Sequence, residues 1–488
     1  MTTSWRLRRA DLAARGDAPA LVGAGPALSY RELGRAAGAL AAALGQAGLR
    51  GGDRVGVLSA ARGHDEAVAV AGALLAQGTV VPLDPSAPPL RLAEVLAGCG
   101  CRAIIHDAAA AERLGAPGLE GQLARFELDP AGRLVARRGS APAVAAADPE
   151  IACILHTSGS TGRPKAIPIR WEGLAAFTAW MIELTGLGPG DRVLRSAELV
   201  FDLAWFDHVA TWRAGATLCT VARRELGLPS ALLAAAQRLR PTVVYAVPAL
   251  YSRLVAALGP GRNLDASLRV ACFAGEVFAP RELRELARRA PGARLFNLFG
   301  PTETNVCTFH EVDRSRLDRE SELPIGVACP YARCALVAED GSGAVIAGPG
   351  TGELVVEGPT ALGGRVATGD RVERAADGLF YFRGRKDRML KIRGYRIEPG
   401  EIEAALCAHP RVREAAVLAR EHRKLGTVLH GFVALDPGKD EASEREMRAF
   451  VAGRLPAYMV PERIRVREAL PRTSTGKIDY LLLAAEAC

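Results

Sequence analysis

One segment of the chain gathers hydroxyl groups, glycines and a lysine within ten residues. It reads His156-Thr157-Ser158-Gly159-Ser160-Thr161-Gly162-Arg163-Pro164-Lys165 and directly follows the apolar stretch 151–155. Backbone N–H groups, hydroxyl donors and one ammonium group can together surround a polyphosphate. A solvated linker would not normally follow a buried strand and end in Pro-Lys. The residues predicted to bind phosphate are Thr157, Ser158, Gly159, Ser160, Thr161, Gly162 and Lys165.

A second segment, residues 297–304, ends an apolar stretch in a tight turn. It presents the aromatic ring of Phe299, the hydroxyl of Thr302 and the carboxylate of Glu303 close together, with Gly300 at the bend. The alternative is the start of a helix, with Glu303 near the positive end of the helix dipole. We therefore treat these residues as candidate ligand-binding groups.

A third candidate is Asp202, in Phe201-Asp202-Leu203-Ala204-Trp205-Phe206-Asp207, which comes straight after an apolar stretch. Burying a carboxylate is costly unless a cation pairs with it. Asp202 could therefore hold a positively charged group, and its alternative role is to cap a helix.

Lysine is rare in this chain, with only six among 62 basic residues. A lysine supplies a compact point charge where arginine supplies a planar fork. Lys391 and Lys477 lie in glycine-containing segments, and Asp370 and Arg385 lie in similar turns. Surface turns carry such charges routinely, so a solvated side chain is the alternative for each of the four.

The elements that must position these residues alternate between strands and helices. A capping box at Ser29 and Glu32 precedes an apolar helical face. This rhythm predicts parallel-rich sheets covered by helices, which bind ligands where strands run into turns. Residues 114–150 are weakly patterned, and we expect a peripheral connection there. Strands are expected at 54–58, 79–83, 102–106, 151–155, 242–247, 268–273 and 293–299, and a helix at 65–75.

The pattern changes twice toward the carboxy terminus. After Pro330, short strand candidates with glycine turns predict a small antiparallel module. Beyond Asp387 the chain restarts with strands and helices of its own. We therefore predict an α/β protein whose large N-terminal domain, 1–386, has parallel-rich sheets with helices and this module. A small mobile α+β C-terminal domain, 387–488, follows a hinge at Asp387.

Composition excludes several classes of function. The net charge is +8, but the basic residues are spread evenly, so we expect no nucleic-acid partner. No apolar run reaches the roughly 18 residues that a membrane helix needs, and the amino terminus is not a secretory signal. The ten cysteines show no CxxC spacing for zinc or redox chemistry. We expect a cytoplasmic enzyme without a membrane partner.

Taken in order, these segments resemble the adenylate-forming superfamily of acyl-CoA synthetases, luciferases and peptide-synthetase adenylation domains. The resemblance spans nearly the whole chain, from Leu28-Ser29-Tyr30-Arg31-Glu32-Leu33 and Val81-Pro82-Leu83-Asp84-Pro85 to Gly476-Lys477. It implies ATP and Mg²⁺ as cofactors, and a reaction that produces an acyl-AMP and pyrophosphate before transfer to a thiol.

The resemblance also implies a role for each nucleotide-binding candidate. Phe299, where the family usually has Tyr, would stack on the adenine. Thr302 would lie near the α-phosphate and Glu303 near Mg²⁺. Asp370 would accept both ribose hydroxyls with Arg385 beside it, although the customary Tyr before this motif is missing.

Two lysines would serve the two half-reactions. Lys477 would bridge the attacking carboxylate and a phosphate oxygen, and so neutralise charge in the transition state of adenylation. The resemblance implies that the small domain then rotates. Lys477 would be withdrawn, and the region of Lys391 and Gly394 would line a tunnel for pantetheine.

In members of the family that activate amino acids, the residue matching Asp202 holds the substrate's ammonium group. None of the other matching positions can pair with a charged side chain, so a small apolar amino acid is implied. The set resembles that of free-standing L-proline-activating ligases, which supply pyrrole units to prodiginine- and pyoluteorin-type natural products. The implied pocket comprises Asp202, Leu203, Phe206, Tyr245, Cys272, Ala274, Leu298, Val306 and Cys307.

The thiol must come from another molecule, because the sequence has no carrier segment and no HHxxxDG condensation motif. A separate phosphopantetheinyl carrier protein is the expected partner. Three alternatives remain open: an acyl- or aryl-CoA synthetase, a D-alanine–carrier protein ligase, and a degenerate adenylate-binding scaffold. Intact Lys165, Glu303, Asp370 and Lys477 argue against the scaffold.

Overall fold

The computed structural model describes residues 5–115, 123–139, 147–158, 164–319, 322–422, 426–436, 442–472 and 478–486. The chain divides into two compact units. The large unit comprises residues 1–85, 96–155 and 167–386, and the small unit comprises 86–95, 156–166 and 387–488. Two short stretches from the first half of the chain thus belong to the small unit, and the hinge at Asp387 stays a prediction.

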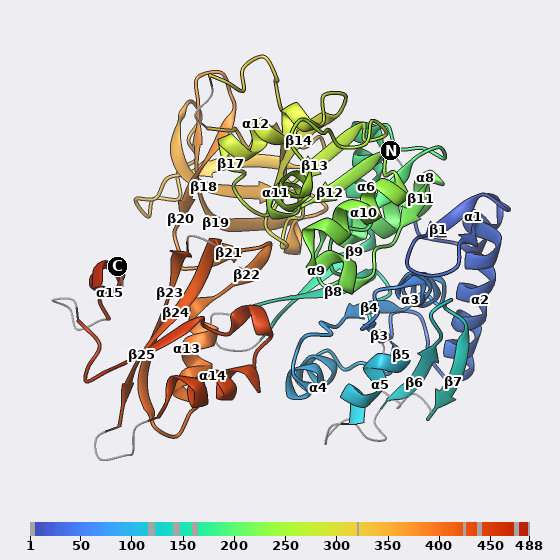
Figure 1. The fold of residues 1–488 in the computed structure, drawn as a ribbon, viewed down its shortest axis with the longest axis horizontal. Helices are drawn as coiled ribbons and strands as arrows, with labels where there is room; N and C mark the ends of the chain where they lie inside the picture. The colour runs from blue at the N-terminus through green and yellow to red at the C-terminus, as the bar shows by residue number, and fades with distance from the viewer. Residues whose placement is uncertain are drawn as a thin grey trace. The chain divides into compact units, whose positions relative to one another are not determined.

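A nine-stranded sheet of the large unit contains the strands expected at 242–247, 268–273 and 293–299 (Figure 1). The strands from β14 to β1 are parallel, as the alternation of strands and helices predicted. Their order is β16 (Val327–Ala328), β15 (Thr308–Glu311), β14 (Arg294–Phe299), β13 (Val270–Phe273), β12 (Val243–Ala246), β10 (Arg192–Leu194), β11 (Thr217–Cys219), β1 (Pro19–Val22) and β2 (Leu28–Ser29).

A seven-stranded sheet corrects one expectation from the sequence. Residues 114–150 are not a mere connection, because β6 and β7 add two strands to this sheet. The alternating burial of β6 supplies the apolar face that a sheet needs. The strand order is β7 (Leu134–Arg138), β6 (Ala124–Leu128), β5 (Ala103–Asp107), β3 (Arg54–Leu58), β4 (Thr79–Pro82), β8 (Ile151–Thr157) and β9 (Lys165–Arg170).

Two helices show how the large unit is packed. α2 (Tyr30–Gln46) begins at the expected capping box, in which Ser29 and Glu32 bond each other's backbone N–H. α3 (His64–Leu75) is buried on nearly all its faces, which accounts for its unusually apolar sequence. One hydrophobic cluster joins both helices to strands of both sheets, so this core lies at the centre of the large unit.

The remaining helices cover the sheets or connect them. α10, α11 and α12 each begin with proline in the first turn, where its missing N–H costs nothing. Among the described residues, no helix has the length and apolar character to span a membrane. Their bounds are α1 (Arg9–Ala13), α4 (Pro89–Gly98), α5 (Ala108–Ala111), α6 (Trp171–Thr185), α7 (Leu203–Trp205), α8 (Thr211–Ala214), α9 (Arg223–Gly227), α10 (Pro229–Leu239), α11 (Pro248–Ala257) and α12 (Pro280–Arg289).

The expected antiparallel module is a four-stranded sheet of the large unit. Its strands, in order, are β17 (Arg333–Val337), β18 (Gly350–Glu357), β19 (Arg365–Arg374) and β20 (Phe380–Arg385).

The small unit has the predicted α+β character and its own hydrophobic core. Its elements are the hairpin β21 (Leu390–Ile392) and β22 (Tyr395–Ile397), the sheet β23 (Val412–His422), β24 (Gly426–Leu435) and β25 (Arg463–Arg467), and the helices α13 (Pro399–Cys407), α14 (Glu444–Ala452) and α15 (Tyr480–Glu486).

Candidate active site

The carboxyl ends of three parallel strands form one wall of the candidate acid pocket. Tyr245 on β12 lies in register with Cys272 on β13, which in turn lies in register with Phe296 on β14. Because alternate residues of a strand share a face, Ala274 and Leu298 continue the same wall two residues further on. These residues all belong to the central hydrophobic cluster of the large unit. The structure therefore brings these predicted pocket residues together on one face.

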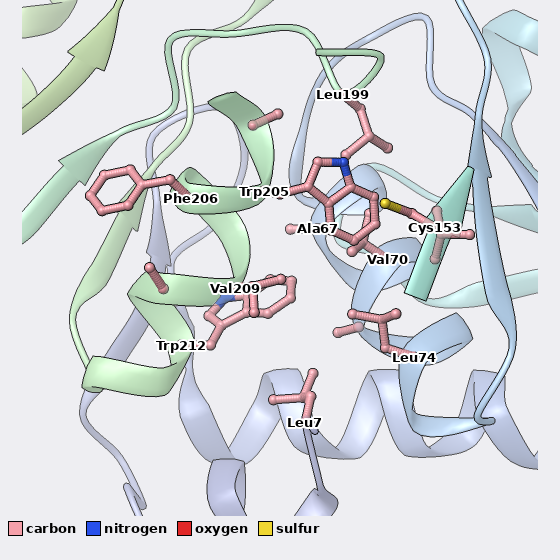
Figure 2. Packing of buried hydrophobic residues seen from close by; sticks show 14 of the residues in the cluster. Leu7, Ala67, Val70, Leu74, Cys153, Leu199, Trp205, Phe206, Val209 and Trp212 are labelled. Carbon is pink, nitrogen blue, oxygen red and sulfur yellow. The ribbon is translucent and has the colours of Figure 1, made fainter. Parts of the chain in front are cut away.

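The segment from Asp202 to Ala210 supplies a second wall. Leu203 opens the short helix α7, and a π-helix, Phe206–Ala210, follows it. The Phe206 ring lies edge-on to that of Tyr245, with centroids 5.6 Å apart. Figure 2 shows Phe206 pointing away from the neighbouring Trp205, which packs toward Cys153. The helix thus separates a core-filling ring from a ring that faces the strand wall.

Asp202 stands at the start of α7, yet its side chain makes no capping hydrogen bond. The role of helix cap, which the sequence left open, is therefore not the one adopted. Burial raises the pKa of Tyr245 and of Cys153 well above their usual values, and the Asp202 carboxylate raises both further. Its negative charge therefore acts on β12 and on β8. This is a suitable position for a carboxylate that meets a cationic ligand.

The turn after β14 is tight and largely buried. A Cβ on Gly300 would lie 1.7 Å from the Asn305 carbonyl oxygen, so only glycine fits there. The backbone forms turns rather than a helix over residues 302–306, so the alternative of a helix start at Glu303 is wrong. Glu303 itself is 6% exposed.

Val306 and Cys307 follow this turn and are buried as well. The Cys307 N–H donates to the Phe299 carbonyl oxygen at 2.8 Å, which closes the turn. The Tyr331 hydroxyl donates to the Val306 carbonyl oxygen at 2.6 Å. The last two predicted pocket positions are therefore fixed against the end of β14.

The predicted ribose-binding pair is formed across two neighbouring strands. Asp370 on β19 lies opposite Arg385 on β20, and Arg385 Nη1 donates to Asp370 Oδ1 at 2.6 Å. The Phe299 ring lies 5.8 Å from the ring of Phe382, also on β20. The Leu362 N–H donates to the Glu303 carbonyl oxygen at 2.8 Å. Adenine, ribose and metal candidates from distant parts of the sequence are thus neighbours in the large unit.

Three of the phosphate-binding candidates can be described, and all belong to the small unit. The buried Thr157 hydroxyl ends β8 with no hydrogen-bond partner among the described residues. The Ser158 hydroxyl donates to the Arg396 carbonyl oxygen at 2.8 Å and accepts from the Glu398 N–H at 2.9 Å. Lys165 begins β9 and is exposed. Gly159, Ser160, Thr161 and Gly162 lie outside the described residues.

Of the two predicted catalytic lysines, only Lys391 lies among the residues that the structure describes. Lys391 lies on β21, opposite Arg396 on β22. Arg393 and Gly394 make the turn of this hairpin with φ angles of 54° and 81°. Such a two-residue turn requires left-handed backbone at both positions. Lys477 lies outside the described residues, so its role stays a prediction.

Among the residues that the structure describes, no group of three or more His, Cys, Asp or Glu side chains could hold a metal ion. Mg²⁺ commonly takes only one or two carboxylates from a protein, and completes its octahedron with phosphates and water. A single buried carboxylate at Glu303 fits a cation that arrives with ATP.

A set of buried charges beside the candidate acid pocket was not predicted from the sequence. Arg62, Glu66, Arg195 and Asp207 are at most 4% exposed. No sequence pattern singled out Arg62, Glu66 or Arg195. A possible signal was the position of Asp207, one residue after the pocket residue Phe206.

Together, the strand ends, the tight turn and the Asp370–Arg385 pair define an α/β enzyme with candidate sites for a nucleotide and a small acid. The model of the AMP-binding enzyme family matches residues 8–364. That of the AMP-binding enzyme C-terminal domain matches residues 401–477. The chain therefore belongs to the AMP-binding enzyme family and is an adenylate-forming ligase that uses ATP.

Curated relatives match over nearly full length. An L-proline--[L-prolyl-carrier protein] ligase of Pseudomonas fluorescens is 36% identical over 475 residues, covering 94% of each chain. A protein of the same name from Streptomyces coelicolor is 35% identical over 522 residues, covering 99% of this chain and 96% of its own.

Solved structures agree with the fold. The amide bond synthetase McbA from Marinactinospora thermotolerans superposes with a TM-score of 0.83 at 22% identity, covering 98% of this chain and 99% of its own. That likeness concerns the fold alone. IdnL1 superposes with a TM-score of 0.79 at 28% identity, covering 95% of this chain and 98% of its own.

Proposed function

We propose that the protein activates L-proline with ATP and transfers the prolyl group to the phosphopantetheine thiol of a separate carrier protein. The observation that carries this proposal is the position of Asp202, a carboxylate that caps no helix and borders a wall of buried apolar residues. An acid with an ammonium group would pair with this carboxylate. A fatty or aryl acid has no ammonium group and would gain nothing from this carboxylate.

The size of the pocket residues favours a small side chain. Phe206, Tyr245 and Leu298 are at most 2% exposed and limit the depth available to the ligand. Apart from Asp202, the predicted pocket positions carry no charge, so an ionic side chain on the substrate would have no partner. L-proline combines a cationic nitrogen with a compact apolar ring. Two relatives that match this chain over at least 94% of its length are named for the same amino acid.

In the first half-reaction, a carboxylate oxygen of the amino acid attacks the α-phosphorus of ATP. The bond to the bridging oxygen breaks, and pyrophosphate leaves. Asp370 and Arg385 would orient the ribose, and Phe299 the adenine. Lys477 would neutralise the charge that develops on the oxygens, and Thr302 would lie near the α-phosphate. Mg²⁺, held by Glu303, would supply further charge neutralisation at the phosphates.

In the second half-reaction, the pantetheine thiolate attacks the acyl carbon of the prolyl-AMP. The bond from that carbon to the phosphate oxygen breaks, and AMP leaves. Lys391 and the region of Gly394 would line the path of the thiol after rotation at Asp387. We propose that this thioester serves the cytoplasmic synthesis of a natural product containing a pyrrole unit.

ATP–pyrophosphate exchange tests the substrate assignment. Purified protein is assayed with the proteinogenic amino acids, D-alanine, β-alanine, and several aryl and fatty acids. We expect dominant exchange with L-proline. Dominant exchange with D-alanine would point to the D-alanine–carrier protein ligase. Exchange only with acids that lack an amino group would contradict the role of Asp202 and favour an acyl- or aryl-CoA synthetase.

Intact mass spectrometry tests the acceptor. Protein, ATP and the best amino acid are incubated with a phosphopantetheinylated carrier protein or with free CoA. We expect the aminoacyl mass on the carrier protein and none on CoA. The unmodified carrier, without phosphopantetheine, is the control.

A further inference from the structure

Four charged side chains are buried beside the acid pocket, and neither half-reaction uses them. Arg62 and Arg195 are 0% exposed, Asp207 is 0% exposed, and Glu66 is 4% exposed. Transferring charges out of water costs free energy that their mutual attraction does not always restore. A group of this kind so close to a binding site therefore calls for a role.

Arg62 and Asp207 form hydrogen bonds with the backbone of residues 195–197. Arg62 Nη2 donates to the carbonyl oxygens of Arg195 and Ala197, at 3.2 and 2.7 Å. Between these carbonyls, the Ser196 N–H donates to Asp207 Oδ2 at 3.0 Å. Consecutive polar groups of the backbone are thus bonded to buried ions. This fixes the segment 195–197 more firmly than neutral hydrogen bonds would.

The held segment is connected to both walls of the pocket. It comes directly after β10 and leads within five residues from Ala197 to Asp202. The Ser196 hydroxyl also donates to the Tyr245 carbonyl oxygen at the end of β12. One residue, Ser196, therefore joins the Asp207 carboxylate to the strand that carries the Tyr245 ring.

Neighbouring residues of the π-helix reach different partners, because successive side chains of any helix point in different directions. Phe206 and Asp207 are its first two residues. Phe206 contacts the Tyr245 ring, and Asp207 bonds Ser196. π-helical turns are rare and often occur at functional sites. Figure 2 shows the same separation for Trp205 and Phe206, which point in different directions.

We propose that Asp207 is a positioning residue for recognition of the amino acid. By holding Ser196, it sets the separation between the Asp202 carboxylate and the Tyr245 wall, and thereby the size of acid that fits between them. This inference rests on the proposed function, because it takes the wall of Asp202 and Tyr245 to be the amino-acid pocket.

The neighbouring arginines favour the ionised form of Asp207, which accepts hydrogen bonds. Burial raises the pKa of Asp207 to about 7, although hydrogen bonding from the Ser196 N–H and the positive charges of Arg195 and Arg62 act to lower it. Arg195 is paired with Glu66 in turn. The carboxylate is thus bonded on one oxygen, while Asp207 Oδ1 has no hydrogen-bond partner among the described residues.

The test separates positioning from stability with three variants at two residues. Asp207→Ala removes the acceptor, and Asp207→Asn keeps an oxygen that can accept from the Ser196 N–H. Ser196→Ala leaves that bond in place and removes only the hydroxyl bonded to Tyr245. For each variant, ATP–pyrophosphate exchange gives KM for the amino acid, KM for ATP and kcat, and thermal unfolding gives Tm.

Asp53→Asn is the matched control. Asp53 is a buried carboxylate, 4% exposed, that accepts from the Arg50 N–H at 2.6 Å and is paired with Arg102. It directly precedes β3 of the other large sheet. Its substitution is expected to lower Tm without changing the ratio of the two KM values.

For Asp207→Ala we expect KM for the amino acid to rise about tenfold or more, since small errors of placement are costly. KM for ATP should stay within about twofold of the wild type, with kcat less affected than KM. Discrimination between L-proline and L-alanine should fall. Asp207→Asn should restore most of the loss, and Ser196→Ala should change KM in the same direction by about threefold.

The proposal is overturned if both KM values rise together, or if Asp207→Ala and Ser196→Ala lower Tm alone. If Asp207→Ala does not fold, Ser196→Ala decides the question. All constants are measured with the acid that gives the strongest exchange in the wild type. A wild type that activates no amino acid would refute the proposed function, whereas an unchanged KM ratio would refute only the positioning role.

Discussion

The strand wall of the large unit and the lysine hairpin of the small unit differ in how their functional groups are held. Tyr245 and Cys272 lie in register on parallel strands and are at most 2% exposed. Lys391 lies on a two-stranded hairpin whose turn is made by Arg393 and Gly394. The residues proposed to select the acid are therefore part of a hydrophobic core, whereas the lysine proposed to line the path of the thiol is only partly buried.

From this difference we expect substitutions in the two regions to have different effects. Substitution in the wall should change specificity and stability together, because the same atoms fill the core and shape the pocket. Substitution of a lysine should change a rate and leave the free energy of unfolding unchanged.

The largest expected effect is on Lys477, which the family resemblance assigns to adenylation. Lys477→Ala should lower ATP–pyrophosphate exchange by about 10²–10³, because a charge that stabilises the transition state is lost. Its Tm should match the wild type. Lys439→Ala, at a lysine outside every motif, is the control and should retain activity. Normal exchange by Lys477→Ala would remove the lysine from the adenylation step.

Asp202→Asn should come next. Loss of the carboxylate should lower kcat/KM for the amino acid by about 10²-fold, because the ammonium group then has no charged partner. KM for ATP should not change, since the nucleotide candidates lie on other elements. Exchange kinetics at varied amino acid and varied ATP make this comparison. A uniform fall in both would mean that the substitution damages the fold rather than the pocket.

The buried His208 should make the large unit sensitive to acid. Burial and the charge of Arg195 lower the pKa of His208 to about 3, and its Nδ1 bonds the Ala204 carbonyl oxygen at 2.8 Å. The unfolded chain binds this proton at its ordinary pKa, so stability is lost as pH falls below about 6.5. Between pH 7 and pH 5 this loss is about 2 kcal/mol.

The measurement is urea unfolding of the wild type and of His208→Gln at both pH values. The raised pKa of Asp207 acts in the opposite direction, since the folded state then binds a proton more tightly than the unfolded state. The difference between the two proteins therefore isolates His208. Equal losses in both proteins would show that this histidine is not held neutral.

The smallest effect is expected at Phe206, where the wall and the core coincide. Phe206→Leu should lower the free energy of unfolding by about 1–2 kcal/mol and admit bulkier acids, because a planar ring is replaced by a smaller side chain. Relative exchange with pipecolic acid and L-proline, together with urea unfolding, measures both effects. A change in stability without a change in selectivity would place Phe206 in the core alone.

Much of this arrangement could be predicted from the sequence because it depends on local patterns. β3 has the expected bounds, and the strands that end near Tyr245, Cys272 and Phe299 lie where their apolar runs predicted. β6 was missed because its five residues follow a segment rich in alanine and glycine, which hid the alternation of Ala124, Phe126 and Leu128.

Long-range polar contacts could not be predicted in this way. Arg62 and Arg195 are 133 residues apart in sequence, and nothing in either segment indicates that an arginine is buried. Charged residues are normally found at the surface, and these two arginines are exceptions to that rule. The π-helix at Phe206–Ala210 was not predicted either, because the sequence gives no periodic signal for it.

The most direct test of the central claim compares L-proline with cyclopentanecarboxylate, which has the same ring without the nitrogen. Both acids are offered to the wild-type protein in ATP–pyrophosphate exchange at saturating ATP. If Asp202 binds the ammonium group, exchange with the carbocyclic acid should be lower by about 10²-fold or more, because that acid has no ammonium group to pair with the carboxylate. Equal exchange with the two acids would contradict this account.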